Sequence, residues 1–170
     1  SSINDEMYRK ITENRTVEEA EAKATAKVVA LSAVKYGDLS NQASKDYIFD
    51  IDRFTSFEGN TGPYILYTIV RIKSILNKYK EAGKEAGTAA ILPAHSESEK
   101  ALMLELTRFN AMMENAYEET APHKVCSYIY DLANALNHFY HETKIMAEED
   151  EAVQASYVRL LTPVSYTHLR

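Results

Sequence analysis

Two tyrosines and an arginine recur at helical spacing in one stretch of this 170-residue chain. Tyr64, Tyr67 and Arg71 are three and four residues apart, so on a helix they share one face. Aromatic rings can stack on unpaired bases and a guanidinium can hold a phosphate, a combination that suits single-stranded RNA. The alternative is that both tyrosines pack on a second helix and Arg71 pairs with a carboxylate. Spacing alone leaves both interpretations open.

A helix from Pro63 to about Lys80 would carry these side chains. Thr61 is the expected N-cap, Pro63 suits a first helical turn, and Gly83 is expected to stop the helix. At 3.6 residues per turn, a second stripe lies roughly 140° away around the helix. This apolar stripe, which we expect to be buried, consists of Ile65, Ile69, Ile72, Leu76 and Tyr79.

Further segments accompany this stretch, which reads Phe-Glu-Gly-Asn-Thr-Gly-Pro-Tyr from Phe57 onward. In chain order they are Ala33–Ser40, Asp46–Asp52, Pro122–His123, Tyr128–Ala133 and Phe139–Tyr140. Together they resemble arginyl-tRNA synthetases, at the point where the catalytic domain of that family passes into its helical anticodon-binding domain. The likeness covers about Val17 to Leu161, and several matches in the right order are more specific than one short pattern.

The resemblance implies an all-α fold, a helical bundle preceded by the helical tail of the catalytic domain. Residues 1–57 would be this tail, which in the family contacts the inner side of the tRNA. Residues 58–162 would be the anticodon-binding domain, and residues 163–170, which do not match, are expected to be a non-native tail. The family's His-x-Gly-His segment and lysine-containing loop for ATP are missing from this sequence. We therefore expect ATP, Mg²⁺ and arginine to be bound upstream of Ser1, with no cofactor in this part.

The family attaches arginine to tRNA-Arg in an ATP-dependent step of protein biosynthesis, so the resemblance implies recognition of the anticodon stem-loop. All arginine codons have G in the middle, and the cognate anticodons therefore share a middle C. Each base stacked on an aromatic ring contributes about 1–3 kcal/mol. The residues expected to contact the tRNA are Asn60, Tyr64, Tyr67, Arg71, Lys73, Lys78, Tyr130, Asn134 and Asn137. Tyr128 and Tyr140 are expected to pack instead.

Charge argues against one function class and leaves others open. A net charge of −6 is unlike a protein that coats nucleic acid without specificity. One local basic face remains possible, since several cations follow Tyr67 closely and an acidic run begins only at Glu148. The alternatives are a helical module that docks a protein partner and a stand-alone relative without ligase activity. The docking module predicts no tRNA affinity and little salt dependence.

Composition favours a helical protein in a reducing compartment. Only 5 Gly and 4 Pro accompany long runs of Ala, Leu, Glu and Lys. The single cysteine, Cys126, allows no internal disulfide, which is typical of a reducing compartment. No apolar run reaches the roughly 18 residues of a membrane span, and the first residues do not read as a secretory signal. We expect a cytoplasmic monomer that does not enter a membrane.

The N-terminal part is expected to hold two helices. The first spans about residues 3–14, and the second runs from the capping box Thr16–Glu19 to Gly37. Residues 38–54 contain either a short extended segment or irregular chain. The apolar stripe expected on the second helix consists of Val17, Ala20, Ala24, Val28, Leu31 and Val34.

Three more helices are predicted after a loop over residues 83–95. A capping box at Ser96–Glu99 opens a helix to about Glu119, and Pro122 opens the next, to about Glu142. The acidic run begins the last helix, which Pro163 is expected to end. The side chains expected inward are Leu102, Leu106, Phe109, Met113 and Tyr117 on the first of these helices and Val125, Ile129, Leu132, Leu136 and Phe139 on the second.

Residue types that support metal or nucleophilic chemistry are present but are not arranged for it. His138 and His141 have no carboxylate three residues before them, unlike the Glu-x-x-His pattern of di-iron bundles. Cys126 lies beside apolar residues on a helix and is expected to be buried and inert. The segment Gly59–Gly62 is too short for a phosphate-binding loop. We therefore expect no catalytic residue and no metal site.

Residues 1–170 alone are expected to be unable to activate arginine, because the ATP-binding signatures of the family are missing from them. The measurement is arginine-dependent ATP–pyrophosphate exchange, with a complete arginyl-tRNA synthetase as the positive control. Turnover by residues 1–170 would contradict this expectation.

Overall fold

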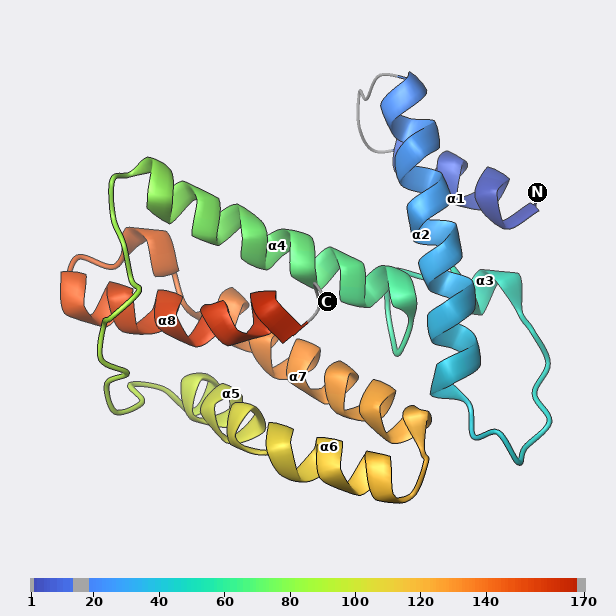
Figure 1. Cartoon of the computed structure of the whole chain (residues 1–170). Coiled ribbons are helices and arrows are strands. Elements are labelled where there is room, and N and C mark those ends of the chain that lie inside the picture. The colour runs from blue at the N-terminus through green and yellow to red at the C-terminus, as the bar shows by residue number, and fades with distance from the viewer. Residues whose placement is uncertain (1, 14–18, 168–170) are drawn as a thin grey trace. The chain divides into compact units, whose positions relative to one another are not determined.

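The computed structural model describes residues 2–13 and 19–167, and within these ranges all regular structure is helical (Figure 1). The predicted all-α fold is therefore confirmed. The elements are α1 (Ser2–Thr12), α2 (Glu19–Ser40), α3 (Ile51–Phe54), α4 (Gly62–Glu81), α5 (Glu97–Thr107), α6 (Phe109–Glu118), α7 (Pro122–Glu142), the 3-10 helix η1 (Ile145–Ala147) and α8 (Glu151–Thr167). The chain divides into unit 1, residues 1–67 and 112–130, and unit 2, residues 68–111 and 131–170.

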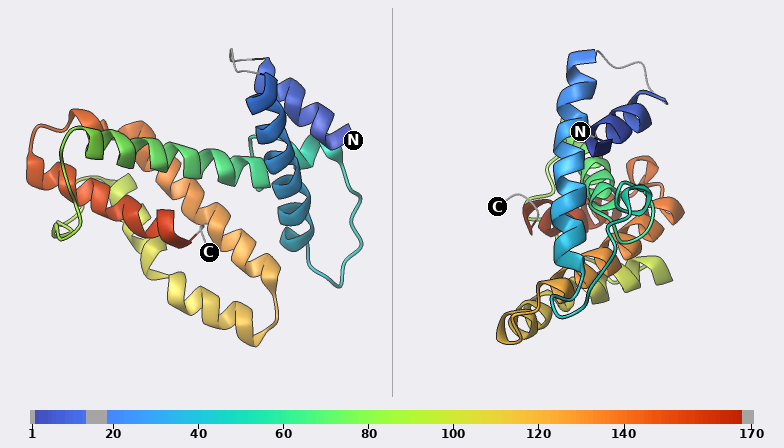
Figure 2. Two further views of the ribbon diagram at one scale, coloured as in Figure 1. Left: turned by 45° about the horizontal axis from the view of Figure 1, so that its top comes forward. Right: turned by 90° about the vertical axis from the view of Figure 1, so that its right-hand side faces the viewer.

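In unit 1, α1 packs on α2 through small side chains (Figure 2). Met7 of α1 is fully buried against Ala26 and Ala30 of α2. The apolar stripe predicted for α2 was wrong, since Val28 and Leu31 are 62% and 55% exposed. Alanine side chains form most of the buried face, together with Val29, and small side chains let the two helices approach closely.

The helix α2 does not end at Gly37 as predicted but continues to Ser40. Gly37 is buried, and a Cβ built on it would lie 1.9 Å from a ring carbon of Phe54. This glycine makes room for an aromatic ring and does not act as a helix stop. The capping box predicted at Thr16 lies outside the described residues.

Residues 41–50 form turns and irregular chain, followed by the single helical turn α3. Of the two alternatives for this region, irregular chain is the one observed. The Asp50 carboxylate caps α3 by accepting from the Arg53 N–H at 3.2 Å. The Phe54 ring stacks on Phe49 with centroids 4.6 Å apart, which holds the irregular segment against α2.

The first residue of α4 passes α2 in close backbone contact. A Cβ built on Gly62 would lie 2.6 Å from the backbone oxygen of Ser32, so only glycine fits there. Thr61 caps α4 as predicted, because its hydroxyl accepts from the Tyr64 N–H at 3.2 Å. Pro63 occupies the first turn of α4, which is also confirmed.

The far end of α4 and its buried stripe also follow the prediction. Gly83, with a φ of +74°, lies two residues after the last residue of the helix and lets the chain turn away. Of the predicted stripe, Ile65, Ile72 and Tyr79 are buried, and the other two side chains are half-buried. The loop predicted over residues 83–95 is confirmed.

In unit 2, α8 lies alongside the second half of α7. The rings of Phe139 and Tyr157 meet with centroids 5.4 Å apart, and both are buried. Gln154, also buried, accepts from Lys84 Nζ at 2.7 Å and donates to the Ile145 carbonyl at 3.0 Å. These bonds attach the residues after α4 and the turn before α8 to α8 itself.

The helix predicted over residues 97–119 is two helices, α5 and α6, interrupted at Arg108. Its start is confirmed, because the Ser96 hydroxyl accepts from the Glu99 N–H at 3.1 Å. The interruption changes which side chains face inward. Ala116 is buried on α6, whereas Met113 and Tyr117, both predicted inward, are exposed, Tyr117 by 88%.

The helix α8 begins as predicted but does not end at Pro163. The Asp150 carboxylate accepts from the Ala152 N–H at 2.9 Å, which places negative charge at the start of the helix. The helix then continues through Pro163 to Thr167. Proline lacks the N–H that would bond to the carbonyl four residues earlier, so the helix loses this one bond without ending.

Replacement of Gly62 by alanine is expected to lower the free energy of unfolding by about 1–3 kcal/mol, because the new methyl meets a backbone oxygen that cannot turn aside. Gly87→Ala is the matched control, since a Cβ there meets no atom within 4 Å. Urea unfolding followed by circular dichroism gives both values. Equal stability of the two variants would contradict the close contact.

Candidate nucleic-acid interface

The residues predicted to contact RNA lie in both units, and each unit holds its own group. In unit 1 they are Asn60, Tyr64, Tyr67 and Tyr130, and in unit 2 they are Arg71, Lys73, Lys78, Asn134 and Asn137. The prediction that Tyr64, Tyr67 and Arg71 form one continuous face concerns both units and stays a prediction.

Tyr64 and Tyr130 form a ring pair in unit 1. Their centroids are 5.8 Å apart and their planes meet at 65°, the edge-on arrangement that aromatic pairs favour. Both side chains are half-buried, so packing on a second helix is observed for Tyr64. Tyr67, almost one turn further along α4, is 44% exposed. Tyr67 therefore offers more accessible ring surface than either member of the pair.

Asn60 lies at the hydroxyl of Tyr36, a residue that the sequence analysis did not single out. This hydroxyl is 2.6 Å from Asn60 Oδ1 and 2.9 Å from the Cys126 carbonyl oxygen. One hydroxyl proton serves one acceptor well, and turning the amide by 180° lets Asn60 donate to the hydroxyl while the hydroxyl donates to Cys126. We call these three residues the Tyr36 link.

In unit 2, Arg71 is oriented by two side chains of α7. Its Nη1 donates to Asn137 Oδ1 at 2.6 Å, and its guanidinium carbon lies 4.4 Å from the centroid of the Tyr140 ring. Asn137 is only 8% exposed and donates from its Nδ2 to Thr68 Oγ1 at 2.9 Å. Because a guanidinium can only donate, this arrangement determines the orientation of the Asn137 amide.

These two partners of Arg71, an amide and an aromatic ring, are both uncharged. A planar guanidinium held in this way suits a phosphate or carboxylate, which it can bind through two parallel N–H groups. Tyr140 was expected to pack, and it does so against the guanidinium itself. The signal that could have found it is its distance of three residues from Asn137, which places both on one side of α7.

The remaining candidates in unit 2 are exposed. Lys73, Lys78 and Asn134 all lie on the surface, and no ion pair involves either lysine in the part of the chain that the structure describes. Lys84 differs, because it is bound to Gln154. Tyr128 is buried, which confirms that it packs.

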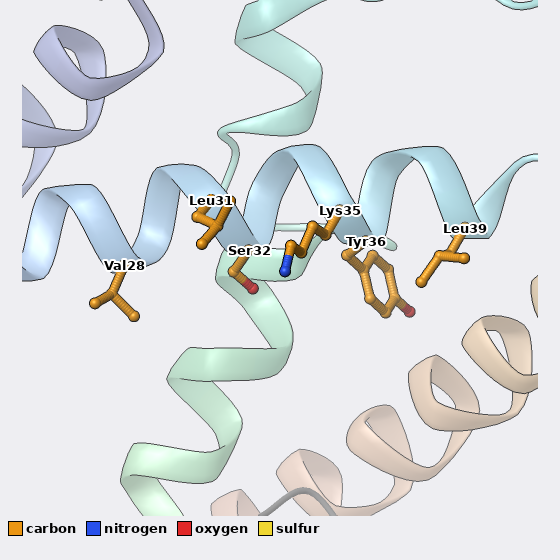
Figure 3. Close-up of a pocket in the computed structure, with 6 residues that line it drawn as sticks. All are labelled: Val28, Leu31, Ser32, Lys35, Tyr36 and Leu39. Atoms are coloured by element: carbon orange, nitrogen blue, oxygen red, sulfur yellow. The ribbon is translucent and has the colours of Figure 1, made fainter.

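A hollow of about 380 Å³ lies elsewhere in unit 1, along one face of α2 (Figure 3). It is lined by Val28, Leu31, Ser32, Lys35, Tyr36 and Leu39. Only one of these side chains is charged, so the hollow does not suit a phosphate backbone. It is therefore separate in chemistry from the predicted RNA contacts.

Among residues 2–13 and 19–167, no group of three or more His, Cys, Asp or Glu side chains is arranged to hold a metal ion. Within the same ranges, none of the helices combines the length and the apolar character that crossing a bilayer requires.

The family described as "DALR anticodon binding domain" matches residues 65–166, more than half of the chain. The chain belongs to this family. Tyr67, Arg71 and Asn137 lie inside the matched range of the DALR domain, whereas the loop that carries Asn60 precedes it.

Relatives of this DALR domain are arginine–tRNA ligases. The protein of Agathobacter rectalis is 65% identical over 167 residues, and that of Alkaliphilus oremlandii is 51% identical over 160 residues. Each match covers 94% of this chain but only 28% and 27% of the relative, so the chain spans well under a third of their length.

Solved structures agree with the fold. The arginyl-tRNA synthetase of Thermus thermophilus is 26% identical with a TM-score of 0.79, and the match covers 98% of this chain and 29% of that one. That of Plasmodium falciparum, at 23% identity and a TM-score of 0.81, also covers 98% of this chain and 29% of its own. At this lower identity the likeness concerns the fold alone.

The DALR domain encloses the only cysteine of the chain, and its reactivity is expected to be low. Burial raises the pKa of the Cys126 thiol to about 11. At about pH 8 its thiolate fraction is therefore about a hundredfold below that of an ordinary thiol. Iodoacetamide should alkylate the folded chain at least that much more slowly than the urea-unfolded chain. Equal rates would show that Cys126 is accessible and ionised.

Proposed function

We propose that this chain binds the anticodon stem-loop of tRNA-Arg as the C-terminal part of an arginine–tRNA ligase. The match of residues 65–166 to an anticodon-binding family carries the proposal. The amino acid, arginine, is inferred from the two ligase relatives, which are similar over 94% of the chain.

Within this proposal, the side chains differ in what they do. Tyr67 offers its exposed ring to an unpaired base of the loop, and Arg71 holds a phosphate or the edge of a base. Lys73 and Lys78, both exposed on the same helix, add phosphate contacts that depend on salt. Asn137 acts through Arg71, because its amide is bound to the guanidinium and to Thr68.

The ring pair and Asn134 complete the set. Tyr64 and Tyr130 expose part of each ring and can present an edge or a hydroxyl to the loop. Asn134 is exposed on α7 and can reach a base edge through its amide. These contacts would distinguish the shared middle C of arginine anticodons from other bases.

The rest of the ligase would bind ATP, Mg²⁺ and arginine, and this chain would contribute recognition but no bond-making step. The setting that we propose is the cytoplasm, where a monomer of the ligase supplies arginyl-tRNA for protein biosynthesis. This division of labour is supported by the share of the relatives that the chain spans, 28% and 27%.

Filter binding to a tRNA-Arg anticodon stem-loop tests the proposal. Tyr67→Ala is expected to weaken binding by about 1–3 kcal/mol, the contribution of one stacked base. Arg71→Ala is expected to weaken it and to reduce the slope of log affinity against log salt by about 1. Arg9→Ala is the control, because Arg9 is already paired with Glu6 and Glu13 on its own helix.

The same measurement separates the alternatives. Wild-type affinity that falls steeply as salt is added supports the RNA function. Absence of stem-loop binding would favour a module that docks a protein partner. Affinity unchanged in both Tyr67→Ala and Arg71→Ala would remove these two side chains from the site.

A further inference from the structure

The hydroxyl of Tyr36 joins two segments that are far away in the chain. It reaches the side chain of Asn60, 24 positions later, and the backbone oxygen of Cys126, 90 positions later. Figure 3 shows the Tyr36 ring extending from α2 toward the pale orange ribbon of α7. All three members of the Tyr36 link belong to unit 1.

Both of these segments support a ring of the Tyr64–Tyr130 pair. Asn60 directly precedes Thr61, whose hydroxyl accepts from the Tyr64 N–H. The Cys126 carbonyl lies one turn before Tyr130, at the position to which the Tyr130 N–H points in an α-helix. The link therefore contacts the backbone next to each of the two rings, whose centroids are 5.8 Å apart.

The two ends of the link differ, because its Cys126 end is part-buried and its Asn60 end is exposed. Cys126 is buried and Tyr36 is half-buried, so water competes little at the α7 end. The adjacent Gly62 lies against the Ser32 carbonyl, which leaves the loop before α4 little room to move sideways. A change at the hydroxyl should therefore alter the relative placement of the two rings more than it alters the fold.

We propose that Tyr36 is a positioning residue for the Tyr64–Tyr130 pair, and that Asn60 acts through Tyr36 and does not read a base itself. The effect on RNA rests on the function proposed above, whereas the effect on ring placement does not. Tyr36 lies outside the matched range of the DALR family, on a helix that carries none of the nine residues predicted to contact the tRNA. The proposal thus extends the binding machinery to α2.

The first experiment measures ring placement without RNA. Tyr130 is replaced by 3-fluorotyrosine in the full chain, and its ¹⁹F resonance reports the ring current of Tyr64. Tyr64→Leu defines the resonance position when that ring is absent. Tyr36→Phe keeps the ring and removes only the hydroxyl, and it is expected to move the resonance part of the way toward the Tyr64→Leu position. Tyr117→Phe, on an exposed side chain of the same unit, is the matched control and should leave it unchanged.

The second experiment is a double-mutant cycle on stem-loop affinity. Tyr36→Phe and Asn60→Ala are each expected to weaken binding about 2- to 10-fold, the range for one lost hydrogen bond. The double variant should lose no more affinity than the single variant that binds more weakly, because both changes remove the same link. The salt slope should stay at the wild-type value, since no phosphate contact is lost. Thermal unfolding, followed by circular dichroism, gives the folded fraction used to correct each affinity.

Each outcome decides the proposal. A wild-type ¹⁹F position in Tyr36→Phe overturns it, as does unchanged affinity of the folded Tyr36→Phe chain. Additive losses in the cycle overturn the assignment of Asn60 and make it a separate RNA contact. If the wild-type chain does not bind the stem-loop, the function proposed above fails, and the ¹⁹F shift still decides whether Tyr36 positions the pair.

Discussion

The arrangement of unit 1 depends on a glycine, Gly62, at the start of α4. Because Gly62 has no Cβ, the first turn of α4 can lie against the Ser32 carbonyl of α2. The cap at Thr61 and the Tyr36–Asn60 bond lie beside this contact, since each involves a residue within two positions of the glycine. The start of α4, which carries Tyr64, is therefore held close to the middle of α2.

In unit 2 the main feature is the orientation of the positively charged Arg71 side chain. The Asn137 amide and the Tyr140 ring, two uncharged groups of α7, orient the Arg71 guanidinium. The second bond of Asn137, to the buried Thr68 hydroxyl on α4, keeps the amide in place. Through Asn137, Thr68 therefore helps to orient the guanidinium of Arg71, three residues further along the same helix.

Most sequence signals that act within a few residues were reliable, although the helix stop predicted at Pro163 was wrong, and signals that depend on distant neighbours failed more often. The caps at Thr61 and Ser96 are local hydrogen bonds, and spacing was enough to find them. Gly37 and Gly83 look alike in the sequence, but one receives a ring from residue 54 and the other turns the chain. For the same reason spacing could propose the RNA-facing candidates, but it could not find the Tyr36 link, whose bonds span 24 and 90 positions.

A single enclosed thiol makes this chain suitable for site-selective labelling. Since Cys126 is the only cysteine and is buried, a cysteine introduced on the surface would be the one reactive handle under native conditions. The exposed position of Tyr117 would accept a fluorophore without disturbing a core contact. Energy transfer from such a dye to a labelled RNA could then report the geometry of a complex without removal of the natural thiol.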